Sequence, residues 1–127
     1  MRLSMGRVQA NGTIIGACDV MPVEGDYRQA LMSAIWVLRE LHRLNMQPRL
    51  KDAWLSEPVK LQGMTTHHSD VPVALRVTCG IGTLILEDSR YQLEYGCWAY
   101  LPGGLPYFRM MGLASEARLR FAVVPLA

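Results

Sequence analysis

Two adjacent histidines, His67 and His68, are the residues with the clearest capacity for chemistry in this sequence. An imidazole is a common metal ligand and also a general acid or base near neutral pH. Asp70 follows closely, and Tyr107 is a candidate acid further along the chain. Because neighbours in an extended strand point to opposite faces, both histidines can enter one cavity only if the chain bends between them. A solvated turn between two strands is an equally good interpretation of the pair.

The composition is typical of a folded domain without a strongly charged partner. The chain has 127 residues, of which 50 % are hydrophobic and 19 % charged, and its net charge is +2. These values fit one domain and exclude disorder on composition. The basic residues are scattered, so we expect no nucleic-acid binding. We also expect no membrane span and no signal peptide, because no apolar run has the required length or place.

Cysteine usage favours a reducing compartment. Cys18, Cys79 and Cys97 are odd in number, and no two have C-x-x-C spacing. Such a set cannot form a closed disulfide framework. We therefore expect reduced, buried thiols in a cytoplasmic protein.

The first fifty residues predict a hairpin followed by one helix. Asn11-Gly12 lies between two apolar-tending runs and is typical of a two-residue turn in which both residues have positive φ. Asp26 is a suitable N-cap, and Pro48 stops the helical pattern. Between them, apolar residues recur at spacings of three and four. This pattern predicts a helix over 26–46 that packs against a sheet or a partner subunit.

From Trp54 onward, short apolar runs alternate with Gly, Pro, Asp and Ser. Val73, Leu75 and Val77 share one face of a predicted strand, since side chains alternate along β-structure. Many short strands at regular spacing are typical of a β-sandwich or barrel. The predicted strands span 59–64, 73–80, 83–88, 90–96, 98–102, 106–112 and 118–125.

Residues 96–111, GCWAYLPGGLPYFRMM, resemble the second motif of the cupin family. In that motif a Gly, a Pro and a second Gly precede a metal-binding His. Gly96, Pro102 and Gly104 match the expected spacing, and Tyr107 stands at the position of the His.

The segment that ends at Gly80 resembles the first cupin motif, which supplies two His and one Glu to the metal. Counting back from Gly80 places Val73 at the Glu position. The two His positions then fall on His67 and Ser69, or on Thr66 and His68, according to the spacing used. Together the two motifs and their strands cover about residues 58–125.

The resemblance implies a mostly β fold, a cupin-like antiparallel β-barrel or jelly roll with one N-terminal α-helix. We expect a single domain over 1–127, with the hairpin and helix in 1–50 and the barrel core in 54–127. An α+β roll is the alternative fold. A catalytic metal needs about three protein ligands, and most of the family's ligands are missing here, so we expect no metal and no other cofactor.

Three functions are compatible with such a barrel. The first is binding of a small organic ligand in a mostly apolar cavity. The second is a metal-free isomerase or epimerase, with His67 as base, Tyr107 as acid, and help from Asp70 or Asp19. The third is an interaction protein with a filled barrel. A homodimer is expected under all three. The predicted ligand-binding residues are His67, His68, Val73, Leu75, Val77, Tyr100, Tyr107 and Arg109.

Overall fold

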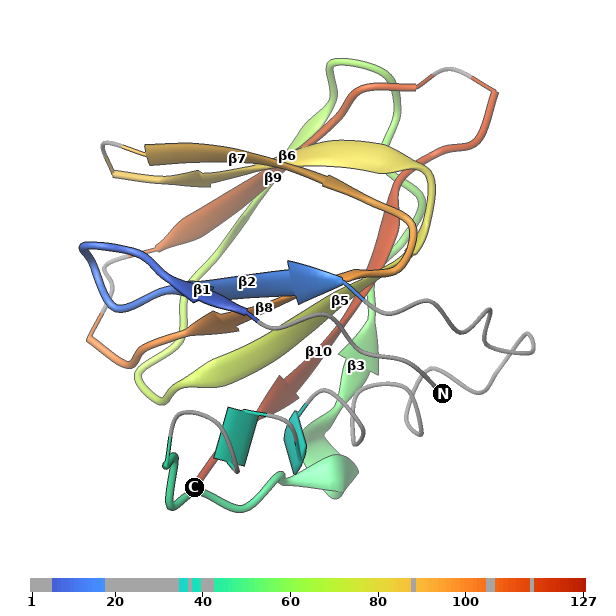
Figure 1. Cartoon of the computed structure of the whole chain (residues 1–127). Coiled ribbons are helices and arrows are strands. Elements are labelled where there is room, and N and C mark those ends of the chain that lie inside the picture. Colours follow the sequence, from blue (N-terminus) through green and yellow to red (C-terminus); the bar gives the residue numbers. More distant parts are fainter. Residues whose placement is uncertain are drawn as a thin grey trace.

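The computed structural model describes residues 6–17, 35–36, 38–39, 43–87, 89–104, 107–114 and 116–127. Ten strands lie within these residues and form two antiparallel sheets that face each other (Figure 1). The six-stranded sheet has the order β1-β2-β8-β5-β10-β3, and the four-stranded sheet has the order β4-β9-β6-β7. The strands are β1 (Arg7–Val8), β2 (Ile14–Ala17), β3 (Trp54–Leu55), β4 (Met64–His67), β5 (Val73–Cys79), β6 (Ile81–Leu86), β7 (Ser89–Glu94), β8 (Cys97–Leu101), β9 (Phe108–Gly112) and β10 (Arg120–Pro125). A short 3-10 helix, η1 (Leu50–Asp52), precedes β3.

The space between the two sheets is filled by apolar side chains. Alternation along β5 places Val73, Leu75 and Val77 in this cluster, with exposed fractions of 3 %, 0 % and 0 %. Leu84 from β6 and Phe121 from β10 belong to the same cluster and are fully buried. The interior is therefore a packed core.

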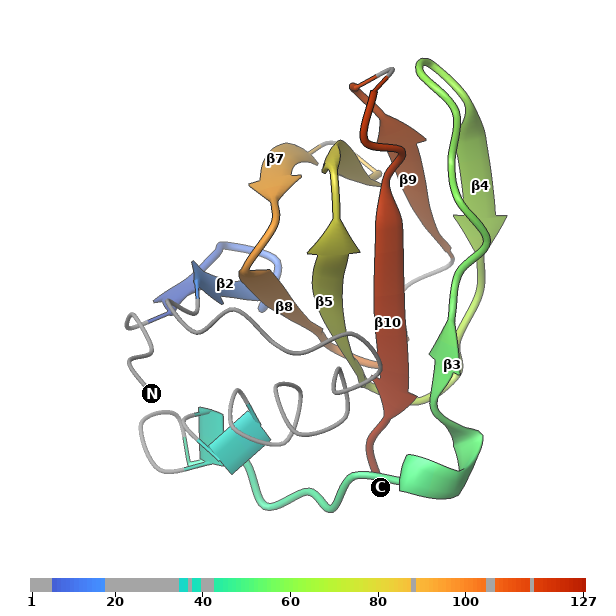
Figure 2. The same cartoon turned by 90° about the vertical axis from the view of Figure 1, so that its right-hand side faces the viewer.

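The other face of the six-stranded sheet carries a second apolar cluster. Trp98 and Tyr100 of β8 share this face, because side chains alternate along a strand, and pack with Ala74 of β5. Ile35 and Leu38 belong to the same cluster. The segment that contains them lies on the side of this sheet away from the four-stranded sheet (Figures 1 and 2). Ile35 and Leu38 therefore cover part of this face.

The predicted helix over 26–46 falls mostly outside the described residues. Within that range the structure describes 35, 36, 38 and 39, which are helical, and 43–46, which are not. Arg43 has a φ of +53°, a left-handed conformation that does not continue a helix. The predicted end at residue 46 is therefore wrong, and the rest of the helix stays a prediction.

The hairpin at Asn11-Gly12 is present, but its turn differs from the predicted one. The Gln9 amide donates to the Thr13 carbonyl, and the Gly12 amide donates to the Gln9 carbonyl. Gly12 has a φ of +86°, whereas Asn11 does not have a positive φ. Three residues thus form the loop, as in a type I turn followed by a left-handed glycine. The Asn11 side chain accepts a hydrogen bond from the Thr13 amide at 3.1 Å.

The hairpin is also part of the barrel wall, because β2 pairs with β8 along its whole length. Residues 6–17 therefore contribute to the same sheet as the predicted core over 54–127.

The predicted strand over 59–64 is displaced toward the C-terminus. Val59 and Leu61 form only isolated bridges, and β4 begins at Met64. Between them Gln62 has a φ of +61°, and the Gly63 amide donates to the Lys60 carbonyl. This tight turn interrupts extended structure, so β4 is the segment that carries His67.

Cys79 and Cys97 are free thiols that are half-buried rather than fully buried. Cys18 lies outside the described residues. In the part of the chain that the structure describes, no helix is long and apolar enough to cross a bilayer.

Candidate functional site

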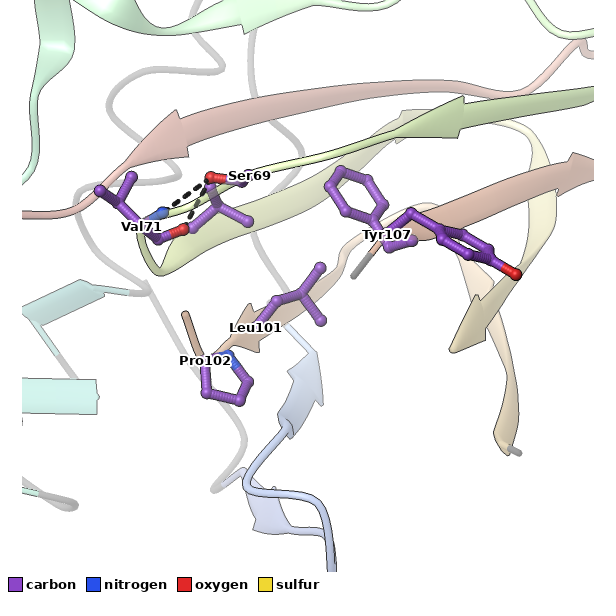
Figure 3. A pocket seen from close by; sticks show the side chains of 7 residues that line it. Ser69, Val71, Leu101, Pro102 and Tyr107 are labelled. Atoms are coloured by element: carbon purple, nitrogen blue, oxygen red, sulfur yellow. Dashed lines mark hydrogen bonds between the residues drawn. The ribbon is translucent and has the colours of Figure 1, made fainter. Parts of the chain in front are cut away.

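Three positions that align with cupin metal ligands meet at one end of the two sheets. Ser69, Val73 and Tyr107 line a small pocket there (Figure 3). Its volume of about 10 Å³ is close to the minimum that holds one water molecule. Val73 begins β5 and pairs with Leu101 at the end of β8, which places the pocket at the barrel mouth. The lining residues are Ser69, Val71, Val73, Leu101, Pro102, Tyr107 and Phe108.

His67, the last residue of β4, faces the interior among aromatic rings. Its ring centroid lies 5.0 Å from that of Trp54, 5.2 Å from that of Phe108 and 5.6 Å from that of Phe121. The His67 Nε2 and Thr65 Oγ1 atoms form a hydrogen bond of 2.9 Å. Burial lowers the pKa of the His67 imidazole, because desolvation disfavours the charged form. His67 is therefore held preferentially as a neutral ring.

His68 points away from the interior. Its side chain is 59 % exposed and its Nε2 lies 3.6 Å from Oδ1 of Asp70, which is itself 92 % exposed. The two histidines thus occupy opposite faces, as strand geometry predicts. The prediction that His68 lines a cavity is wrong, and the interpretation as a solvated turn is confirmed for this residue.

The predicted ligand-binding residues Tyr107 and Arg109 require one side of β9 to face inward, but the opposite side does so. Phe108 and Met110 are buried in the central cluster, so Tyr107 and Arg109 share the outer side of the strand. The Arg109 guanidinium carbon lies 5.5 Å from the centroid of the Tyr107 ring. The Tyr107 hydroxyl points away from the pocket that its backbone end borders (Figure 3). The predictions that Tyr107 and Arg109 point inward are therefore wrong.

Phe108 occupies the interior position that the motif alignment assigned to its neighbour Tyr107. Sequence reasoning missed it, although Phe108 and Met110 are apolar and flank the charged Arg109 along β9. Trp54 and Phe121 were also missed, and their contribution depends on β3 and β10 meeting in the sheet.

Tyr100 belongs to the outer cluster of the six-stranded sheet and not to the barrel mouth. Its hydroxyl donates to the Met46 sulfur at 3.9 Å, and burial raises its pKa. The prediction that Tyr100 lines the cavity is wrong. Leu75 and Val77 point inward as predicted, yet they are packed against other side chains.

The donor set at the motif positions does not fit the metal that cupins hold. Val73 has no ligating atom, and the Ser69 hydroxyl donates to the Val71 carbonyl at 2.7 Å. The His67 Nε2 atom is already hydrogen-bonded to Thr65. Among the described residues, no three His, Cys, Asp or Glu side chains lie together as a metal would require.

An acid–base pair is not assembled either. His67 faces inward while the Tyr107 hydroxyl points outward (Figure 3), and a base and an acid must both reach the reacting atom. Asp70 lies beside His68 and not beside His67, and Asp19 is outside the described residues. The arrangement of His67 and Tyr107 therefore does not support the isomerase interpretation.

Comparison with known proteins finds similarity at the level of structure. No protein-family model matches the chain, and no curated protein matches it in sequence. RmlC from Streptococcus suis, solved in complex with dTDP-D-xylose, superposes with a TM-score of 0.52 and 12 % identity, covering 98 % of this chain and 70 % of that one.

Two further solved structures are similar over smaller shares. A cupin-2 domain containing protein from Shewanella frigidimarina has a TM-score of 0.43 and 21 % identity, covering 68 % of this chain and 88 % of that one. Salicylate 1,2-dioxygenase from Pseudoaminobacter salicylatoxidans has a TM-score of 0.44 and 13 % identity, covering 78 % of this chain and 31 % of that one. Identities this low concern the fold alone. The similarity to RmlC therefore shows that this chain has a cupin-like fold.

Proposed function

We propose that this protein is a non-catalytic, cupin-like interaction protein that has a filled barrel and assembles as a homodimer. One observation carries the proposal. At the position where cupins bind metal and substrate, Val73, Leu101 and Phe108 leave a volume of about 10 Å³. Small-molecule sites typically need about 300 Å³ or more.

The outer side of the four-stranded sheet is the surface that supports self-association. Met64 of β4 lies opposite Met111 of β9, and the Arg109 guanidinium lies beside the Met64 sulfur at 3.9 Å. Met64 is 47 % exposed and Tyr107 is 40 % exposed. We refer to Met64, Tyr107, Arg109 and Met111 as the methionine face.

The methionine face contrasts with the outer side of the six-stranded sheet. There Ile35 and Leu38 pack in one buried cluster with Trp98 and Tyr100. A contiguous patch of exposed apolar side chains on a sheet is typical of an interaction surface. A second copy of the chain, seated face to face on the four-stranded sheet, would cover them.

The mass of the protein in solution tests this proposal. We expect light scattering coupled to size exclusion to give twice the monomer mass of 14.2 kDa. Met64→Lys and Met111→Lys each place a charge inside the proposed interface, next to Arg109, and should yield monomers because like charges repel and a buried unpaired ammonium is costly.

Val8→Lys is the matched control, since Val8 is 59 % exposed on β1 of the other sheet. It should leave the dimer intact. A monomeric wild-type protein would refute the homodimer, and a dimer that survives both methionine substitutions would place the interface elsewhere.

A second candidate function is the binding of a small, flat organic molecule at the barrel mouth. The cluster of Trp54, His67 and Phe108 rings favours it, because aromatic walls with few polar groups are common in ligand sites. Ser69 would supply a polar group at the rim. This function requires the Phe108 ring to move aside, since the present volume admits no ligand of that size.

A further inference from the structure

A shallow depression lies at the opposite end of the sheets from the motif pocket. Its volume is about 340 Å³, within the range of small-molecule sites. It is formed where β6 begins, where β7 ends and where the loop after β9 passes beside them. The lining residues are Gly80, Ile81, Glu94, Tyr95, Ala114 and Ala117.

Backbone contacts fix the walls of this depression. The turn that carries Tyr95 is held by Gly96, whose amide donates to the Val77 carbonyl at 3.4 Å. The Gly96 carbonyl in turn accepts a hydrogen bond of 3.0 Å from Nη1 of the buried Arg76. Across the depression, the Leu113 amide donates to the Ile81 carbonyl at 2.9 Å.

The loop after β9 is pressed closely against the start of β6. A Cβ atom at Gly80 would lie 2.5 Å from the Ala117 carbonyl oxygen, and Gly80 has a φ of +76°. Only glycine fits both conditions without a shift of backbone. The depression is thus shaped by fixed main chain on both sides.

The chemistry of the lining favours a cation. Glu94 is exposed, and among the described residues no ion pair or hydrogen bond engages its carboxylate. Tyr95, the next residue, is 36 % exposed and offers an aromatic ring. The other lining residues are apolar, and no basic side chain is among them. Glu116 and Arg118 lie on the adjoining loop and carry opposite charges.

We propose that this depression binds a small organic cation, an ammonium group carried on a compact apolar body. The Glu94 carboxylate is the counter-ion, and the Tyr95 ring faces the cation, which is attracted by the negative face of the ring. Ile81, Ala114 and Ala117 pack against the apolar part of the ligand. This site is separate from the motif pocket and from the methionine face.

Choline and 3,3-dimethylbutan-1-ol are suitable probes, because they have nearly the same shape and differ in charge. Each is titrated into the isotope-labelled full chain while backbone amide resonances are followed by NMR. We expect choline to shift the amides of Gly80, Ile81, Tyr95 and Ala114 in a saturable way. The neutral alcohol should bind more weakly by roughly five- to tenfold, as expected for loss of a cation–π contact and a charge pair.

Substitutions separate the contributions of the Glu94 carboxylate and the Tyr95 ring to choline binding. Glu94→Gln and Tyr95→Leu should each weaken choline binding by about two- to fivefold, whereas Tyr95→Phe keeps the ring and should bind as the wild type does. Glu87→Gln removes an exposed carboxylate at the other end of the β6–β7 pair and should change nothing.

Equal binding of both probes would show an apolar depression without cation selectivity and would overturn the proposal. Absence of saturable shifts at these four amides would also overturn it. A full loss of choline binding in Glu87→Gln would assign the effect to overall charge instead of to Glu94.

Discussion

At the scale of single residues, the surroundings of His67 decide what its imidazole can do. Three aromatic rings surround it at centroid distances of 5.0–5.6 Å. Its hydrogen bond to Thr65 uses Nε2, a ring nitrogen that could otherwise exchange a proton or bind a metal. The His67 ring therefore packs against the neighbouring aromatic rings, and its Nε2 atom already has a hydrogen-bond partner.

The lowered pKa of His67 predicts how stability depends on pH. The unfolded chain takes up a proton on this residue near pH 6.5, but the folded chain does so only at a lower pH. Because the unfolded state then binds more protons, the contribution of His67 to the free energy of unfolding falls as pH decreases below about 6.5 and does not change above it. Urea unfolding of the wild type and of His67→Phe between pH 5 and 8 measures this. The unfolding free energy of the variant minus that of the wild type should rise toward low pH.

His68→Phe is the control for this measurement, because His68 is 59 % exposed. Its unfolding free energy should follow the wild-type pH dependence. If His67→Phe keeps the full wild-type slope, the pH dependence comes from other groups and the argument for a desolvated His67 is wrong.

At the scale of elements, the packing of β2 on β8 explains why Gly16 lies opposite Trp98. A Cβ atom at Gly16 would overlap the six-membered part of the Trp98 ring. Trp98 is 1 % exposed and anchors the outer cluster of the six-stranded sheet. The indole therefore lies across β2 in the space that glycine leaves free.

Gly16→Ala should consequently destabilise the protein by about 1–3 kcal/mol, the usual cost of overpacking. Urea unfolding gives this value. The same substitution in a Trp98→Leu background should cost less, since the smaller side chain leaves room, and the coupling between the two positions should exceed about 0.5 kcal/mol. Additive effects would show that the ring does not occupy the space above Gly16.

At the scale of the whole molecule, the interior between the two sheets is filled by side chains. Leu75, Val77 and Phe121 are each fully buried in the cluster between the sheets, and Phe108 closes the mouth above them. In a barrel packed in this way, the outer surfaces are the parts left to contact other molecules.

Phe108→Ala is expected to destabilise the protein by about 3–5 kcal/mol, and Phe108→Leu by less, because truncation leaves a cavity. The opened variant should gain thermal stability from a small aromatic compound such as indole, while the wild type should not. Ligand-dependent thermal unfolding measures both. A saturable shift in the wild-type protein would instead favour the small-molecule function.

Much of the architecture was accessible from the sequence. Gly96, Pro102 and Gly104 indicated the cupin-like fold, and the alternation of Val73, Leu75 and Val77 identified an interior face. The prediction that His67 and His68 point to opposite sides also held. These features depend on local rules: glycine at positive φ, and side chains that alternate along a strand.

The sequence by itself therefore determined the class of fold, the residues that share a strand face, and three of the positions that meet at the mouth, Ser69, Val73 and Tyr107. Only the tertiary structure decided which face of β9 turns inward, and so replaced Tyr107 by Phe108 in the interior. It likewise decided that Tyr100 faces the outer cluster. A period of two fixes which side chains lie together, but the side that is buried depends on what packs against each sheet.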